Sequence, residues 1–193
     1  MKRYMIAAGV VLAIASTGLA FSDDSGGRRF SELLNGYKEA AAPISTTGHG
    51  TFQATISLDE SEITYELTFA DLEGDVRQAH IHIGHPQNSG GIVLWLCQTP
   101  TNVSPSATTP QCTQDDPSNL RAGHVTGTLT AADVQAQTAN GIAGPAEWAE
   151  VLGLIRAGRT YANVHSVKFG GGEIRSQLDS GADDHADHDH GHH

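Results

Sequence analysis

The stretch Ala79-His80-Ile81-His82-Ile83-Gly84 decides the fold, because apolar and imidazole side chains alternate strictly along it. Successive side chains of a β-strand point to opposite faces of the sheet. His80 and His82 therefore share one face, and the three apolar side chains between and beside them share the other. The pattern predicts a strand over residues 76–83 with one face for a core and one face that carries two imidazoles.

Two segments about eighty residues further on, 161–166 and 172–178, repeat this alternation. Each places apolar residues on one face and polar residues on the other. The apolar positions are Ala162, Val164, Ile174 and Leu178. The polar positions are Asn163, His165, Glu173, Arg175 and Gln177. We therefore expect a final hairpin that presents imidazole, amide, carboxylate and guanidinium groups on the face opposite the core.

The remaining elements are read from the same periodicities. Alternation predicts strands over residues 50–58, 63–69 and 123–130, and the apolar run 92–96 predicts a central strand covered on both faces. Residues 145–157 show helical spacing instead, with a proline at the start and Gly158 at the end. The chain is thus predicted to be all-β, a single β-sandwich of seven to eight strands with one short helix before the last hairpin.

These segments also carry a family resemblance. The blocks 80–84, 90–93, 127–133 and 158–178 resemble the CHRD domain, the repeated domain of chordin that is also found in bacterial extracytoplasmic proteins. The earlier segments 30–36 and 48–52 are similar to its opening strands. The resemblance implies one domain over residues 29–178, a sandwich of immunoglobulin-like or Cu,Zn superoxide dismutase-like type. It implies no established biochemical activity.

Residues 1–20 are typical of a signal peptide. Lys2 and Arg3 precede an apolar run over residues 5–15, and small residues ending at Ala20 form a cleavage site. The apolar run is too short to span a bilayer comfortably, so we expect no membrane insertion. We expect cleavage near Ala20, a polar linker over residues 21–28, and a secreted or periplasmic protein.

The charge balance excludes one class of partner. Beyond residue 20 the chain keeps nine basic residues against 22 acidic ones, a net charge of −13. Nucleic acids and anionic membrane surfaces are bound through basic patches. The sequence therefore predicts no nucleic-acid binding.

Two cysteines, Cys97 and Cys112, flank a segment rich in Pro, Thr, Ser and Gln. In an oxidising compartment a pair at this spacing is expected to form a disulfide. Loop closure of this length stabilises a fold by about 3 kcal/mol. Free thiols are the alternative, whereas a Cys-x-x-Cys redox motif is absent from the sequence.

The histidines suggest a metal site. Two imidazoles on one strand face can reach a common ion, and His165 from a neighbouring strand would complete a set of three with an open position. Such a set suits copper or zinc. His80, His82 and His165 resemble part of the ligand set of copper-zinc superoxide dismutases, and Arg175 is similar to the arginine that attracts the anion there. A bridging histidine and a zinc loop have no counterpart in this sequence.

Two other interpretations of the same residues remain open. His80 and His82 can form a structural polar cluster with Asn163, Glu173 or Gln177 through hydrogen bonds across the strands. Arg175 and Glu173 can form an ion pair that organises the last hairpin. The same face can alternatively bind an organic ligand.

The C-terminal segment 179–193 combines five aspartates with five histidines and offers no apolar residue larger than alanine. Such a composition cannot form a core, so we expect a disordered tail. Its histidines are His185, His188, His190, His192 and His193. Histidine-rich tracts bind divalent metal loosely.

The function that these observations favour is an exported, non-enzymatic binding module, with a transition metal as the best-supported ligand. One alternative is a copper-dependent oxidoreductase that resembles superoxide dismutase. Another is a structural module of the envelope or matrix with no ligand. An extracytoplasmic protein partner is compatible with each of these functions.

Overall fold

The computed structural model of the protein describes residues 27–40 and 42–179, and these ranges contain eight strands. The strands are β1 (Arg28–Asn35), β2 (His49–Ile56), β3 (Glu62–Ala70), β4 (Val76–Ile83), β5 (Ile92–Cys97), β6 (Gly123–Thr130), β7 (Thr160–Ser166) and β8 (Ile174–Gln177). One α-helix, α1 (Trp148–Arg156), precedes the last two strands. The predicted all-β class, strand number and single short helix are confirmed.

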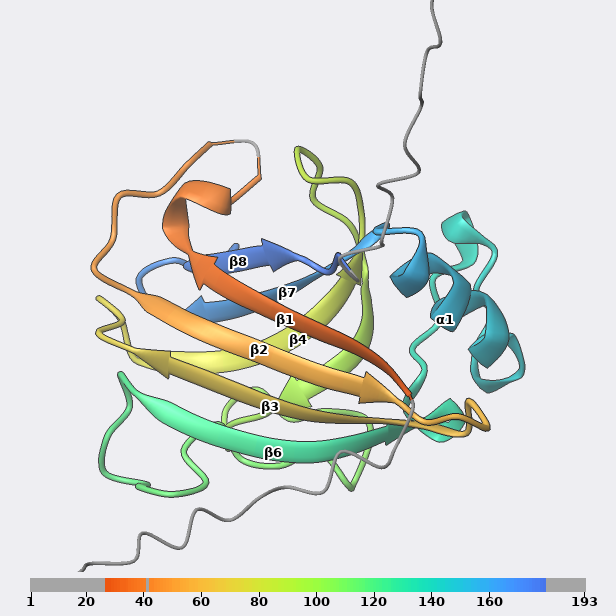
Figure 1. Cartoon of the computed structure of the whole chain (residues 1–193). Helices are drawn as coiled ribbons and strands as arrows, with labels where there is room; N and C mark the ends of the chain where they lie inside the picture. The colour runs from red at the N-terminus through yellow and green to blue at the C-terminus, as the bar shows by residue number, and fades with distance from the viewer. Residues whose placement is uncertain (1–26, 41, 180–193) are drawn as a thin grey trace, which may run out of the picture.

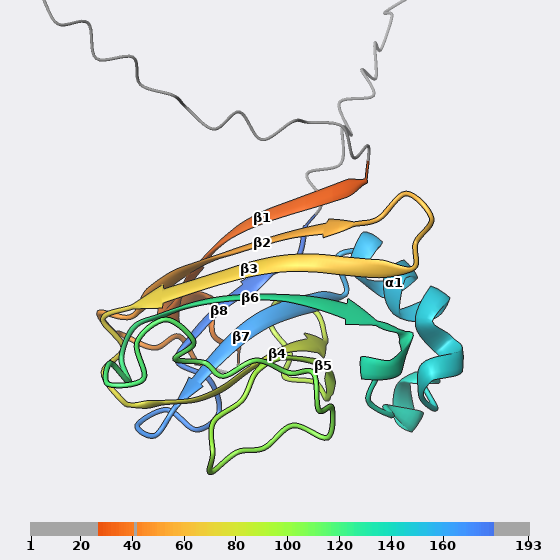
Figure 2. The ribbon, with the colours of Figure 1, turned by 90° about the horizontal axis from the view of Figure 1, so that it is seen from below.

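All eight strands belong to one sheet, in the order β5-β4-β7-β8-β1-β2-β3-β6, and every neighbouring pair is antiparallel. The sheet curls so strongly that its two halves face each other as the layers of a sandwich (Figures 1 and 2). Figure 2 shows β1, β2, β3 and β6 in one layer above β4, β5 and β7 in the other. The two halves enclose the core.

The core follows the alternation that the sequence predicts. On β2 and β3 the inward positions are fully buried, Phe52 and Leu67 among them, whereas the positions between them are largely solvated. Ala79 and Ile81 from β4 and Val164 from β7 enter the same cluster from the opposite layer. Burying such side chains is the main driving force for closing the sheet. Strand β2 ends at Ile56, so Leu58 lies in the turn and is 72% exposed.

Strand β5 differs from its prediction as a central strand, because it lies at one end of the strand order. Its residues Val93, Leu94 and Leu96 are nevertheless fully buried. The edge is covered by other groups: the Tyr65 hydroxyl donates to the Leu96 carbonyl at 2.6 Å, and the Gln135 N–H donates to the Val93 carbonyl at 2.9 Å. An apolar run thus indicates that a strand is buried, but the groups that bury it can be neighbouring strands or covering loops.

The helical segment is shorter than the predicted range 145–157. A 3₁₀ turn over Pro145–Glu147 precedes α1, whose residues Val151, Leu152 and Ile155 join the core at one end of the sheet (Figure 1). A second 3₁₀ turn, Ala131–Asp133, follows β6. The Asp133 carboxylate there accepts from the Thr130 N–H at 2.8 Å. This is the capping arrangement expected of an acidic residue at that position.

The predicted disulfide between Cys97 and Cys112 is confirmed, and it closes the connection from β5 toward β6. No helix in the described ranges is long and apolar enough to cross a membrane. The predicted signal peptide and most of the predicted linker lie outside the described residues, and so do the tail histidines. Arg28, predicted to end the linker, is already paired with Ile56 in the sheet.

Candidate metal centre

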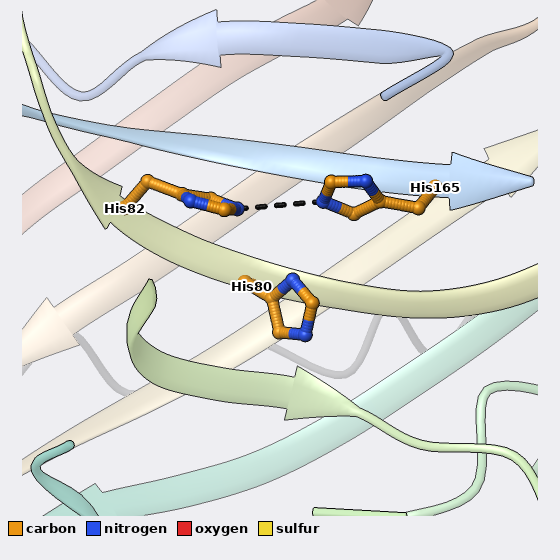
Figure 3. A group of neighbouring side chains, drawn as sticks. All are labelled: His80, His82 and His165. Carbon is orange, nitrogen blue, oxygen red and sulfur yellow. Dashed lines mark hydrogen bonds between the residues drawn. The ribbon is translucent and has the colours of Figure 1, made fainter. Parts of the chain in front are cut away.

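The three histidines of the sequence prediction converge on one face of the sheet. Strands β4 and β7 are antiparallel neighbours, with His80 opposite Asn163 and His82 opposite Tyr161. Because Ala79, Ile81, Ala162 and Val164 face the core, the histidines occupy the other face of this layer. Figure 3 shows the rings of His82 and His165 pointing toward each other, with the ring of His80 beside them.

The ring nitrogens are close enough to share one ion. One nitrogen from each histidine lies within 4.8 Å of the others, and all three residues are buried. The Nε2 atoms of His82 and His165 are 3.4 Å apart. Among the described residues this is the only group of three or more His, Cys, Asp or Glu side chains with such spacing.

Two backbone carbonyls fix the tautomers of this pair. The Nδ1 atom of His82 lies 2.9 Å from the Gly90 carbonyl oxygen, and that of His165 lies 3.1 Å from the Gly170 carbonyl oxygen. A carbonyl oxygen only accepts, so Nδ1 carries the proton and donates in both rings. In the neutral rings the two Nε2 lone pairs then face each other. A hydrogen bond between two lone pairs is impossible, whereas a cation between them satisfies both.

Burial keeps these rings neutral near pH 7. It lowers the pKa of His82 to about 4 and that of His165 to about 4, despite the opposing effect of the two carbonyl contacts. The pKa of His80 falls to about 2, first because of burial and then because of the neighbouring His165 and His82. Neutral imidazole is the form that binds metal.

His80 is the least satisfied polar residue of the group. Both of its ring nitrogens are buried and neither has a hydrogen-bond partner among residues 27–40 and 42–179. Its ring meets the indole of Trp95 edge to face, with centroids 4.3 Å apart. A buried polar group without a partner destabilises a fold by about 1–3 kcal/mol, so it is retained where it has another use.

The two carbonyl acceptors come from glycine-containing loops that sequence reasoning did not connect with the site. A Cβ atom at Gly90 would overlap the carbonyl oxygen of Ile83, so the chain needs glycine to fold back over His82. At Gly170 the nearest atom to such a Cβ would be the Arg77 guanidinium, at 3.4 Å. In the sequence, a pair of glycines follows each of β4 and β7, and these pairs could have indicated the two loops.

Tyr161 and Arg175 form a stack beside the histidines. The Tyr161 ring lies parallel to that of His82 with centroids 4.9 Å apart, and the Arg175 guanidinium lies 3.4 Å from the centre of the Tyr161 ring. Arg175 also donates to the His85 carbonyl at 2.8 Å and to the Asn88 carbonyl at 3.1 Å. Arg175 is only 1% exposed, and these contacts hold its guanidinium in place.

The predicted hydrogen bonds from the histidines to Asn163, Glu173 and Gln177 do not form among the described residues. Asn163 donates to the Glu39 carboxylate at 2.6 Å and to the Ile174 carbonyl. Gln177 donates to the carbonyls of two residues in the neighbouring loops, Gly84 and Gly158. The members of the predicted polar cluster therefore form hydrogen bonds with other partners than the histidines.

Glu173 lies apart from Arg175, and no ion pair joins them in the described part of the chain. Its carboxylate accepts from the Thr46 hydroxyl at 2.7 Å and from the Glu73 N–H at 2.6 Å. The parity argument failed here because Glu173 precedes β8, directly after Gly172 with its φ of +133°. Alternation of faces holds only within an extended strand.

The fold and the site together define an all-β domain with a buried three-histidine centre on the outer face of one layer. The sequence matches the CHRD domain over residues 30–178, and the chain therefore belongs to the CHRD domain family. No curated protein and no solved structure matches the chain. The family named by the sequence resemblance is confirmed.

Proposed function

We propose that this CHRD domain is an exported metal-binding module that holds one copper or zinc ion between His80, His82 and His165. The observation that carries the proposal is the pair of Nε2 atoms 3.4 Å apart, each opposite an Nδ1–H that donates to a backbone carbonyl. Metal-binding histidines in proteins are oriented by this kind of second hydrogen bond.

The separation of the two Nε2 atoms fits a tetrahedral ion. Metal–nitrogen bonds of about 2.0–2.1 Å across 3.4 Å correspond to an N–metal–N angle of about 108–116°, which includes the tetrahedral angle. Two ligands of such an ion are about 3.4 Å apart, whereas the three histidine nitrogens span up to 4.8 Å. Metal binding therefore draws the His80 ring inward by up to about 1.4 Å.

The donor set selects the class of metal. Three neutral imidazoles suit zinc and copper, whereas calcium and magnesium prefer oxygen ligands. The disulfide supports the exported location, because disulfides persist in oxidising compartments. The apolar N-terminal segment supports the same location.

Binding is favoured over the two alternatives by specific contacts. Arg175 is buried and its guanidinium contacts two carbonyls and the Tyr161 ring, so it is not positioned to attract an anionic substrate. A purely structural cluster would satisfy its own polar atoms, yet both nitrogens of His80 lack a partner. An ion supplies a partner for the unprotonated nitrogen of His80.

The test uses the full chain with its five tail histidines replaced by alanine, purified without metal-affinity resin. We expect it to bind one Zn²⁺ or Cu²⁺ per chain in calorimetry, and we expect His82→Ala and His165→Ala to abolish that binding. His49→Ala is the matched control, since His49 lies outside the group and is exposed. Unchanged stoichiometry in His82→Ala would contradict the proposal.

A spectroscopic readout is available in the same experiment. Trp95 touches His80, and Trp148 is the second tryptophan of the chain. In a Trp148→Phe background, Cu²⁺ should quench the Trp95 fluorescence at one equivalent. The quenching should disappear in His165→Ala.

A further inference from the structure

A second site lies across β8 from the histidines. A pocket of about 600 Å³ opens between β1, β8 and the 3₁₀ turn η1 (Gly36–Lys38), which lies beside β8 (Figure 1). Tyr37, Pro43 and Pro86 form its apolar walls, and the half-buried Glu39 contributes a carboxyl group. Pockets of this size are typical of small-ligand sites.

Glu39 lacks a counter-ion. Its carboxylate accepts from the Asn163 amide at 2.6 Å, and within the described ranges no lysine or arginine nitrogen lies at ion-pair distance from it. Burial raises the pKa of Glu39 to about 7, with a smaller opposing effect of Arg175. A carboxylate whose charge is uncompensated in a pocket is stabilised by a cation that enters the pocket.

The two basic residues of the pocket are already engaged. The Lys38 ammonium donates to the Leu33 carbonyl at 2.7 Å and to the Ser176 hydroxyl at 2.9 Å. The Arg175 guanidinium donates to two loop carbonyls and lies over Tyr161. Glu32, on β1, accepts from the Ser176 hydroxyl at 3.0 Å. Glu39 therefore has more unused acceptor capacity than Glu32, whose carboxylate also accepts from the Asp179 N–H at 3.0 Å.

Tyr37 adds a surface for a cation. It is 71% exposed and lines the same pocket as Glu39. The face of an aromatic ring attracts ammonium groups, and the two prolines offer contact to a short alkyl chain. We propose that this pocket binds an alkylammonium group on a short apolar stem, with Glu39 as its counter-ion and Tyr37 over its charge. A lysine side chain and a polyamine both carry this group.

The experiment titrates the full chain with n-butylammonium, followed by calorimetry and by backbone amide shifts in NMR spectra. We expect shifts at Tyr37, Glu39 and Ser176. Glu39→Gln should weaken binding at least tenfold, and Tyr37→Leu about two- to fivefold. Glu150→Gln, an exposed charge change on α1, should leave the affinity unchanged. n-Butanol and butyrate should bind at least tenfold more weakly than the amine.

The wild-type chain provides a second test that does not depend on a variant. The charged groups near Glu39 are Arg175, Glu173, Lys38, Glu32 and Asp179. Since burial raises the pKa of Glu39 to about 7, protonation of its carboxylate should weaken amine binding about tenfold between pH 8 and pH 6. Equal affinity in Glu39→Gln, tighter binding of butyrate, or a constant affinity across this pH range would overturn the proposal.

The source of the ammonium group is distinguished by two further ligands. Spermidine represents a free polyamine, and Nα-acetyl-lysine methylamide represents a lysine side chain. Competition of either with n-butylammonium supports the proposal, and the tighter one identifies the source. Failure of both to compete would overturn it.

Discussion

Replacing His80 by leucine should stabilise the metal-free protein while it abolishes metal binding. His80 is fully buried, and neither ring nitrogen has a partner. A neutral imidazole contains one donor and one acceptor, and each unsatisfied group destabilises the fold by about 1–3 kcal/mol. Leucine removes both groups and retains most of the side-chain volume. Allowing for imperfect packing against Trp95, we expect a gain of about 1–3 kcal/mol in the free energy of unfolding.

The assay is urea unfolding of the metal-free chain followed by far-UV circular dichroism, with the midpoint and slope compared between variants. Thr160→Val is the matched control, because the Thr160 hydroxyl is also buried without a partner but lies outside the histidine group. It should stabilise both the metal-free and the metal-loaded protein. A loss of stability in metal-free His80→Leu would refute the reasoning, since it would mean that the ring is satisfied.

Metal should reverse the order of stability. A ligand that binds only the folded state adds about 2.7 kcal/mol at a concentration one hundred times its Kd. Wild type gains this amount and His80→Leu does not. At saturating Zn²⁺ the wild type should therefore equal or exceed the variant, although it is the less stable protein without metal. A parallel gain in both proteins would contradict the role of His80 as a ligand.

Three other outcomes are expected. First, the pKa values of His82 and His165 are lowered to about 4 in the folded protein, so the unfolded chain binds protons at a higher pH than the folded chain does. The free energy of unfolding should therefore fall as the pH drops from about 6.5 to about 4. Urea midpoints measured across this range should fall less steeply in His165→Leu than in the wild type. Second, Gly90→Ala should destabilise the domain and weaken Zn²⁺ binding at least tenfold, because a Cβ atom overlaps the Ile83 carbonyl; calorimetry showing unchanged affinity would contradict this. Third, reduction of the disulfide should lower the free energy of unfolding by about 3 kcal/mol, as measured by urea unfolding, without changing the metal stoichiometry.

The histidine group was predictable because strict alternation governs its two strands. His80 and His82 lie within β4, and His165 lies within β7, so parity alone put all three imidazoles opposite the core. The pairing of β4 with β7 was not given by parity. The structure gives that pairing.

The supporting groups were not predictable in the same way. The carbonyls of Gly90 and Gly170 orient His82 and His165, but the direction of a loop carbonyl depends on dihedral angles that side-chain patterns do not specify. Glu173 left the expected face because alternation stops at the end of a strand. The position of β5 at an edge was missed because a hydrophobic composition indicates that a strand is buried but not whether strands or loops cover it.

The order of strands in the sheet determines when the histidine centre can exist. Strands β7 and β8 lie between β4 and β1, so the last segments of the domain to be synthesised form the middle of the sheet. His82 and His165 meet across 83 residues of chain, a non-local pairing that forms late and slowly in folding. A chain that crosses a membrane unfolded therefore crosses it without this centre. Under the proposed export, the identity of the bound ion is decided by the metals present in the compartment where the domain folds.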